Sequence, residues 1–111
     1  MALVVKCLGC DRRDGNGEVE LYTVPTSKSA LVTSVRLVNV GTGTASASVL
    51  VRAPGGPNYH LTKKFDTILA SGLLVMEDPV TIQASHSVYL EASGTSSPSI
   101  DWIVNGVERD L

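Results

Sequence analysis

The segment from Leu21 to Val51 limits the possible folds of this chain more than any other part of the sequence. It is rich in β-branched and other apolar residues, which suit the pleated surface of a sheet. Pro25 interrupts the first apolar run, and because proline has no N–H to give to a neighbouring strand, it marks a strand end or edge. Glycines at 41 and 43 interrupt the second run and favour a turn. The segment therefore predicts three strands, of which the last two form a hairpin.

The strand expected over Ala30–Val40 alternates imperfectly between apolar and polar residues. Val35 and Val38 would fall on opposite faces of a regular strand, because successive side chains point to opposite sides. Two explanations stay open: both faces of the strand are partly covered, or a β-bulge shifts its register. The following strand alternates cleanly from Ala45 onwards, with Leu50 as the one exception.

Alternating runs continue to the end of the chain. The clearest is His86–Ala92, and Ile100–Val104 follows it, with Trp102 as the expected anchor of the core. Asn105–Gly106 carries a turn signal, so Val107–Leu111 is expected to form a short tail or half-strand. Together with weaker runs, the pattern gives about eight short strands separated by turns. It predicts an all-β chain folded as a single antiparallel β-sandwich, of jelly-roll or immunoglobulin-like type, with a small barrel as the alternative.

The length of 111 residues predicts one domain. We divide the chain into residues 1–17, an N-terminal strand or arm followed by a polar loop, and residues 18–111, the β-sandwich. The loop is expected over Asp11–Gly17, where charged residues and glycines are dense, and it is either solvated or forms salt bridges with a neighbouring subunit. The candidate interface residues are Leu3, Val5, Arg12, Arg13 and Tyr59.

The formal net charge is −2, which gives no electrostatic reason to expect binding to nucleic acid or to an anionic membrane. No run approaches the ~20 apolar residues that a membrane-spanning helix needs. The apolar start, Met1–Val5, is short, and Lys6 follows it instead of preceding it, so no secretory signal is predicted. We therefore expect the chain to start at or near Met1 and to be made in a cytoplasm.

The two cysteines stand in the sequence Cys7-Leu8-Gly9-Cys10, which is compatible with half of a zinc site or with a redox pair. A structural zinc needs four ligands, and His60 and His86 could complete the set only if folding brings both to the N-terminus. A redox pair would precede a helix, and the charged residues after Cys10 do not begin an amphipathic helix. The favoured interpretation is two ordinary thiols at a strand end, with no metal and no cofactor. Cys7 and Cys10 remain weak candidates for metal ligands.

No arrangement of residues indicates catalysis. A serine or cysteine nucleophile needs a base that a third group holds in place, and the carboxylates here are scattered. His60 and His86 are therefore interpreted as surface or boundary residues. Glu77–Asp78 lacks the further oxygen ligands of a calcium site, and Gly41–Gly43 is not followed by the helix of a phosphate loop. The sequence predicts a protein that is not an enzyme.

Three motifs follow one another in the N-terminal half. Glu18–Pro25 reads EVELYTVP, Lys28 lies in a short polar turn, and Val32–Gly41 is an apolar strand that ends in a V-x-N-x-G-type turn. This order resembles small structural proteins of tailed bacteriophages. The later half is similar to them in rhythm, at Leu69–Gly72 before an apolar run and at Gly106–Glu108 near the end. The cysteine pair and the cluster Asp11–Asp14 depart from the pattern.

The resemblance implies a non-enzymatic β-sandwich component of a virion, in the tail, the neck or collar, a fibre, or a capsid decoration. Such a protein would be made in the cytoplasm of the bacterial host and would act through self-association and docking. Its partners would be other virion proteins and further copies of itself in a homo-oligomer, with a trimer as one option. No nucleic acid and no membrane are expected among them.

Two alternatives from other functional classes stay open. The first is a receptor- or carbohydrate-binding β-sandwich, which would need an exposed aromatic platform built from Tyr22, Tyr59 and Tyr89. The second is a small metal or redox protein that works through Cys7 and Cys10.

Overall fold

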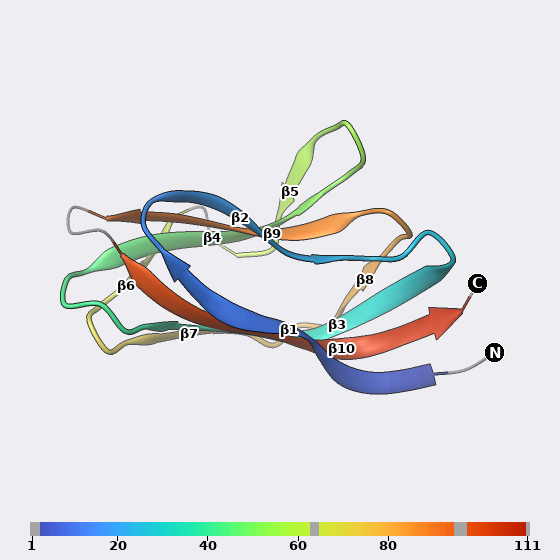
Figure 1. Ribbon diagram of the computed structural model, residues 1–111, viewed down its shortest axis with the longest axis horizontal. Coiled ribbons are helices and arrows are strands. Elements are labelled where there is room, and N and C mark those ends of the chain that lie inside the picture. Colours follow the sequence, from blue (N-terminus) through green and yellow to red (C-terminus); the bar gives the residue numbers. More distant parts are fainter. Residues whose placement is uncertain (1–2, 63–64, 95–97, 111) are drawn as a thin grey trace.

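The computed structural model describes residues 3–62, 65–94 and 98–110, and it describes side chains from Cys7 onwards. In these ranges the chain forms strands and no helix, and the strands make two antiparallel sheets that pack face to face (Figure 1). The predicted all-β sandwich is therefore confirmed, with ten strands instead of about eight. The strands are β1 (Leu3–Asp14), β2 (Gly17–Thr23), β3 (Lys28–Asn39), β4 (Ala45–Arg52), β5 (Asn58–His60), β6 (Asp66–Ile68), β7 (Leu73–Met76), β8 (Val80–Ile82), β9 (Ser87–Gly94) and β10 (Ser99–Asp110).

Each sheet has a long strand along one side and two short strands along the other. The first sheet has the order β1-β10-β3-β7, and β8 pairs with the part of β3 that β7 leaves free. The second sheet has the order β2-β9-β4-β5, and β6 pairs with the other half of β4. The hairpin predicted from Ala30–Val40 and the strand after it is therefore wrong, because β3 and β4 lie in different sheets. Figure 1 shows the two layers, with the β4–β5 hairpin bending away from the second sheet. The described residues contain no helix that could span a membrane.

The core lies between the sheets and is built from the alternating apolar rows that the sequence predicts. In β9, Val88, Leu90 and Ala92 are buried, and in β10 the same holds for Ile100 and Val104 together with Trp102. Trp102 is therefore part of the core, as expected. The residues between them point outwards or are half-buried, because side chains in a strand alternate between the two faces.

A β-bulge explains the imperfect alternation of β3. Ser34 lies opposite Asn105, and the next paired residue of β10, Gly106, lies opposite Val32. One residue of β3, Thr33, is therefore extra, and it moves the buried row from even to odd positions. Val32 and Val35 are both fully buried as a result. Both explanations left open therefore hold: the bulge is present, and Val38, which still lies on the face opposite Val35, is half-buried on the outer face.

The turn predicted at Asn105–Gly106 is wrong. Both residues lie inside β10, which runs without a break from Ser99 to Asp110. A Cβ at position 106 would lie 2.3 Å from the backbone oxygen of Leu31. The glycine is there because β3 approaches closely at its bulge, and a close backbone approach gives the same sequence signal as a turn.

The loop predicted over Asp11–Gly17 is also mostly wrong. Asp11–Asp14 belongs to β1 and pairs with β10, where Asp14 lies opposite Ser99. The turn itself is limited to Gly15 and Asn16. Charged residues are tolerated in β1 because it is an edge strand, and charge is common there.

Leu50, the exception in β4, is buried as well, with 1% of its surface exposed. It does not belong to the cluster between the sheets, so it is covered on the outer face of the second sheet. The chain after β5 folds back over this face, where the backbone N–H of Phe65 donates to Ser48 Oγ at 2.6 Å. β4 is therefore covered on both faces along its centre.

Candidate docking surfaces

The long side of the sandwich presents two strand edges. β1 has 12 residues and pairs only with β10 among the described strands, and β2 has 7 residues and pairs only with β9. An edge strand of an antiparallel sheet leaves about half of its backbone N–H and C=O groups without a strand partner. The free edge of β1 is therefore a template on which another strand can pair.

Arg12 lies on the exposed outer face of the first sheet and forms a two-point contact with Asp101. Its Nε donates to Asp101 Oδ1 at 2.5 Å, and its Nη2 donates to Asp101 Oδ2 at 3.2 Å. The hydrogen bond from Arg12 holds the pKa of Asp101 below its usual range. Arg12 is thus a surface residue, as the interface prediction requires, but its charge already has a partner within the chain.

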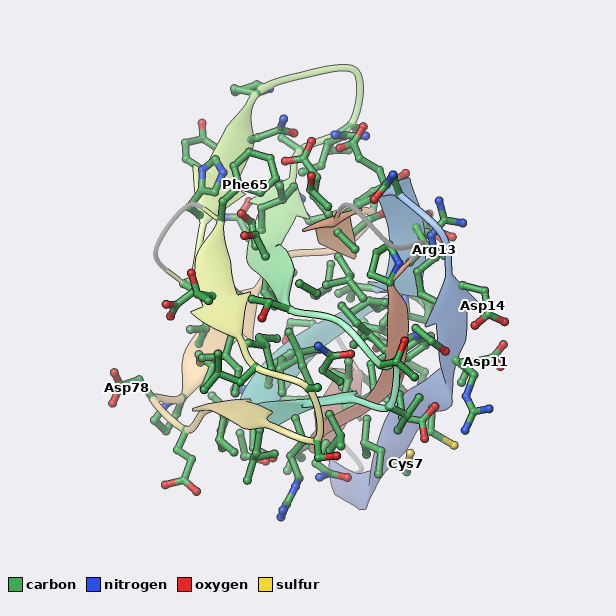
Figure 2. The ribbon with its side chains drawn as sticks, turned by 90° about the vertical axis from the view of Figure 1, so that its left-hand side faces the viewer. Cys7, Asp11, Arg13, Asp14, Phe65 and Asp78 are labelled. Atoms are coloured by element: carbon green, nitrogen blue, oxygen red, sulfur yellow. The ribbon has the colours of Figure 1, made fainter. Side chains whose placement is uncertain are left out.

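Arg13 points a different way. It is half-buried, and its guanidinium donates to the backbone oxygen of Asn16 at 2.7 Å, so it braces the turn between β1 and β2. Figure 2 shows Asp11 and Asp14 on the same strand with their side chains directed away from the body of the sandwich. Of the remaining interface candidates, Leu3 and Val5 pair with β10 through their backbones, and their side chains lie outside the described residues.

The two cysteines share one face of β1. Cys7 lies opposite Asn105 and Cys10 opposite Ile103, so a second bulge between Cys7 and Gly9 has brought both to the outer face of the sheet. Both thiols are free and exposed. His60 and His86 do not join them, and the described residues contain no group of three or more side chains suited to hold a metal ion.

A groove opens at one end of the sandwich, between the β4–β5 hairpin of one sheet and β8 of the other. Its walls are about half polar and half apolar, and the residues that line it are Val51, Tyr59, Leu61, Val80, Thr81, Ile82, Gln83 and His86. Tyr59 has 57% of its surface exposed here. The Nδ1 atom of His86 lies 3.0 Å from the backbone oxygen of Ala84, which leaves Nε2 for other contacts. The groove can accept a flat or ring-shaped group against Tyr59.

The three tyrosines do not form a common platform. Tyr59 lies opposite Val51 and lines the groove, whereas Tyr89 lies opposite Leu50, on the other face of the second sheet. The guanidinium of Arg52 stacks over the Tyr89 ring at 4.2 Å from its centre. Tyr59 is the one of these two that is available to a ligand.

Tyr22 instead joins the two sheets. Its hydroxyl, on β2, donates to Oε2 of Glu108, which is a buried residue of β10. Burial, and then the hydrogen bond to Glu108, raise the pKa of Tyr22. From the sequence alone, Glu108 is expected only in a short tail or half-strand. No sequence signal could have found the pair, because it forms only when the sheets close on each other.

No protein-family model and no curated protein matches the sequence. Solved structures do match. A chain of the acidic stable capsid structure of Helicobacter pylori bacteriophage KHP30 superposes with a TM-score of 0.50 and 16% identity, and the match covers 99% of this chain and 100% of that one. A chain from Bacillus endospore appendages, described as disulfide-linked pili, gives 0.53 and 18%, over 98% and 88% of the two chains.

A mutant VP2 protein of infectious bursal disease virus, in derived T=1 particles, gives a TM-score of 0.54 at 8% identity. That match covers 96% of this chain and 30% of the VP2 chain. At these identities the likeness concerns the fold alone, and the fold in common is the β-sandwich.

Proposed function

We propose that this protein is a non-enzymatic structural component of a tailed-phage virion, and that it acts by self-association and by docking onto the particle. The motif order in Glu18–Gly41 supports the proposal. So does the fold shared with a phage capsid chain over almost the full length of both chains. The tail, the neck or collar, a fibre and a capsid decoration are the positions that the motif order allows.

The observation that carries the proposal is the edge of β1. A 12-residue edge strand is long, and natural proteins usually shorten or cover such edges to prevent pairing with other chains. Here no element covers the edge among the described strands, and only the bulge at Leu8 and the charges of Asp11–Asp14 interrupt it. An assembly protein can use such an edge, because main-chain hydrogen bonds to an added strand supply affinity. Residues 1–17 of the single domain would then provide the docking strand.

The partners in this proposal are further copies of the chain and other virion proteins. Closed symmetry would give a homo-oligomer, with a trimer as one option. Arg12 and the backbone of Leu3 and Val5 lie on the proposed interface, and Tyr59 lies on a separate surface at the groove. Arg13 is engaged with the turn and is not part of the proposed interface.

Two neighbouring proline substitutions test the edge. Successive N–H groups of an antiparallel edge strand point in turn to the partner strand and to the open side. One of the variants Val4→Pro and Val5→Pro therefore removes a backbone hydrogen bond to β10 and lowers the melting temperature. The other removes an N–H on the open side and leaves the melting temperature nearly unchanged. The thermally neutral variant is expected to lose self-association in analytical ultracentrifugation. If the wild type is a strict monomer at high concentration, self-association through this edge is refuted.

Purified particles test the location. Peptide mass spectrometry combined with labelled electron microscopy is expected to find the protein in the virion at a defined, repeated position. A protein present in infected cells but missing from purified particles would contradict the virion role.

The groove supports a second candidate function, a receptor- or carbohydrate-binding module. The exposed Tyr59 ring beside Gln83 and His86 is the specific observation that favours it. Binding on a glycan array that disappears in Tyr59→Ala and persists in Tyr89→Ala would establish this function. No binding by the wild type would remove it.

A further inference from the structure

We propose that Cys7 and Cys10 form a two-thiolate site for one soft, thiophilic monovalent cation of the Cu(I) type. Nothing in the proposed virion role requires this site. Soft thiolate ligands suit Cu(I). Two sulfurs suffice for such an ion, because d¹⁰ Cu(I) readily forms linear complexes with two ligands. The proposal therefore does not depend on the four ligands that zinc needs.

The bulge in β1 creates the pair. Residues three apart in a regular strand point to opposite faces, so this spacing alone would separate the thiols. In β1 the register shifts between Cys7 and Gly9. Leu8 packs against the core, and a Cβ on Gly9 would lie 3.2 Å from the Trp102 ring, so both bulge positions face inwards. Cys7 and Cys10 are left together on the outer face.

The register also sets the distance between the cysteines. They lie opposite Asn105 and Ile103, two positions apart on β10, which corresponds to about 6.5–7 Å along a strand. This spacing lies at the upper limit of the roughly 4.4–6.8 Å that separate the Cα atoms of a disulfide, so an internal disulfide would be strained. Metal–sulfur bonds of about 2.3 Å allow the sulfurs to lie about 4 Å apart or more. The pair therefore suits a bridging ion better than a direct bond.

The electrostatics of the pair agree with this geometry. The Cys7 thiol donates to the backbone oxygen of Gly9, which lies between the two cysteines in the sequence, at 3.3 Å. Two neighbouring thiolates repel each other, and one cation between them removes that repulsion. Binding releases two protons to solvent and changes no oxidation state.

The site is open to solvent and needs no rearrangement of the fold. Both cysteines are exposed, and Ile103, with 40% of its surface exposed, borders them on β10. Arg12, the nearest strand neighbour on the same face, is held by Asp101 and does not need to move. Figure 2 labels Cys7, which lies in the N-terminal half of β1.

An anaerobic titration with Cu(I), in competition with a chromogenic Cu(I) chelator, tests the site. We expect one Cu(I) per reduced chain, confirmed by native mass spectrometry. Cys7→Ser and Cys10→Ser are each expected to weaken Cu(I) binding at least about 100-fold, because a single remaining thiolate cannot chelate the ion. Both positions are exposed, so these variants are expected to fold normally, which circular dichroism checks.

A matched control keeps two thiols but separates them. The double variant Cys10→Ser/Asp11→Cys places the second thiol opposite Trp102, on the other face of β1 and about 10 Å along the strand. It is expected to bind as weakly as the single variants. Equal affinity in the wild type and this control would overturn the proposal. So would a stoichiometry of one ion per two chains, or no measurable binding at all.

Discussion

The two long sides of the sandwich are built differently. On one side run β1 and β2, of 12 and 7 residues, and on the other lie β5, β6, β7 and β8, of 3 or 4 residues each. The short strands share their partners, because β7 and β8 divide β3 between them, and β5 and β6 divide β4. Short and interrupted edges resist pairing with other chains, whereas a long edge invites it. The comparison teaches that, among the described strands, the β1–β2 side offers longer edges for pairing than the opposite side.

The difference also concerns stability. β10 pairs along most of its length with β1 on one side and with β3 on the other. β8 pairs over three residues only. A strand held on both sides cannot relax around a defect as easily as a short edge strand. Two side chains that are equally buried, one on β10 and one on β8, should therefore contribute unequally to the free energy of unfolding.

The largest expected effect compares two buried isoleucines. Ile100 in β10 and Ile82 in β8 are 0% and 2% exposed, so burial alone predicts the same loss. We expect Ile100→Ala to lower the free energy of unfolding by about 2–5 kcal/mol, and Ile82→Ala by roughly half as much, because its site can collapse. Urea unfolding of both variants measures the difference. Equal losses would mean that strand length has no bearing on stability here.

The second prediction compares two glycines. A Cβ at position 106 meets the Leu31 oxygen at 2.3 Å, whereas a Cβ at position 56, in the β4–β5 hairpin, meets only the Pro54 oxygen at 3.6 Å. Gly106→Ala should cost about 1–3 kcal/mol, because β3 must move away from β10. Gly56→Ala should leave the unfolding midpoint nearly unchanged. A neutral Gly106→Ala would show that the bulge region is looser than its contacts imply.

The third prediction concerns the tie between the sheets on the long side. Tyr22→Phe removes the hydroxyl that donates to the buried Glu108 and should cost about 1–2 kcal/mol. Tyr59→Phe, on the short side, serves as the control, because Tyr59 is exposed. A smaller loss for Tyr22 than for Tyr59 would contradict the assignment of this bond as structural.

The same pair predicts a pH dependence. The pKa of Tyr22 is raised in the folded chain, by burial first and by Glu108 second, above the value of about 10 in an unfolded chain. The unfolded state therefore loses its proton first as the pH rises. The contribution of Tyr22 is fully present below about pH 10 and is lost above it. Denaturation at pH 8 and pH 11 should show a smaller decline in Tyr22→Phe than in the wild type.

The smallest effect is expected for the exposed ion pair on β1. Arg12→Gln removes the contact with Asp101, and because both side chains are largely solvated, the unfolding midpoint should hardly change. Any loss should vanish in 1 M salt, where the screening length is only about 3 Å. Thermal unfolding at low and high salt measures it. A large, salt-independent loss would show that the β1 edge depends on this pair.

Residue patterns predict the buried rows of this molecule well, and the ends and bulges of its strands poorly. The alternation in Val88–Ala92 and in Ile100–Val104 is local information, because the two-residue period of a strand does not depend on its partner. The end of β1 was misjudged because Asp11–Asp14 looks the same in a loop and in a solvated edge strand. Gly106 was misjudged because a glycine permits both a turn and a close approach between strands.

The interface role of the candidate residues stays a prediction. Tyr59 and Arg12 are exposed, whereas Arg13 turns inwards to the β1–β2 corner. The spacing of Cys7 and Cys10 suggested a pair, but a regular strand would have set them on opposite faces. The shared face depends on the bulge, and no local pattern marks which strand residue is left without a partner.

The sequence by itself determined the fold class, the buried rows and several of the breaks between the apolar runs, since these follow from the chemistry of neighbouring residues. The tertiary structure alone decided which strands lie at the edges, where the two bulges fall and that Tyr22 meets Glu108. These features arise from pairing between segments far apart in the chain, such as β1 with β10. The free energy of such pairing depends on both strands together and cannot be assigned to either one.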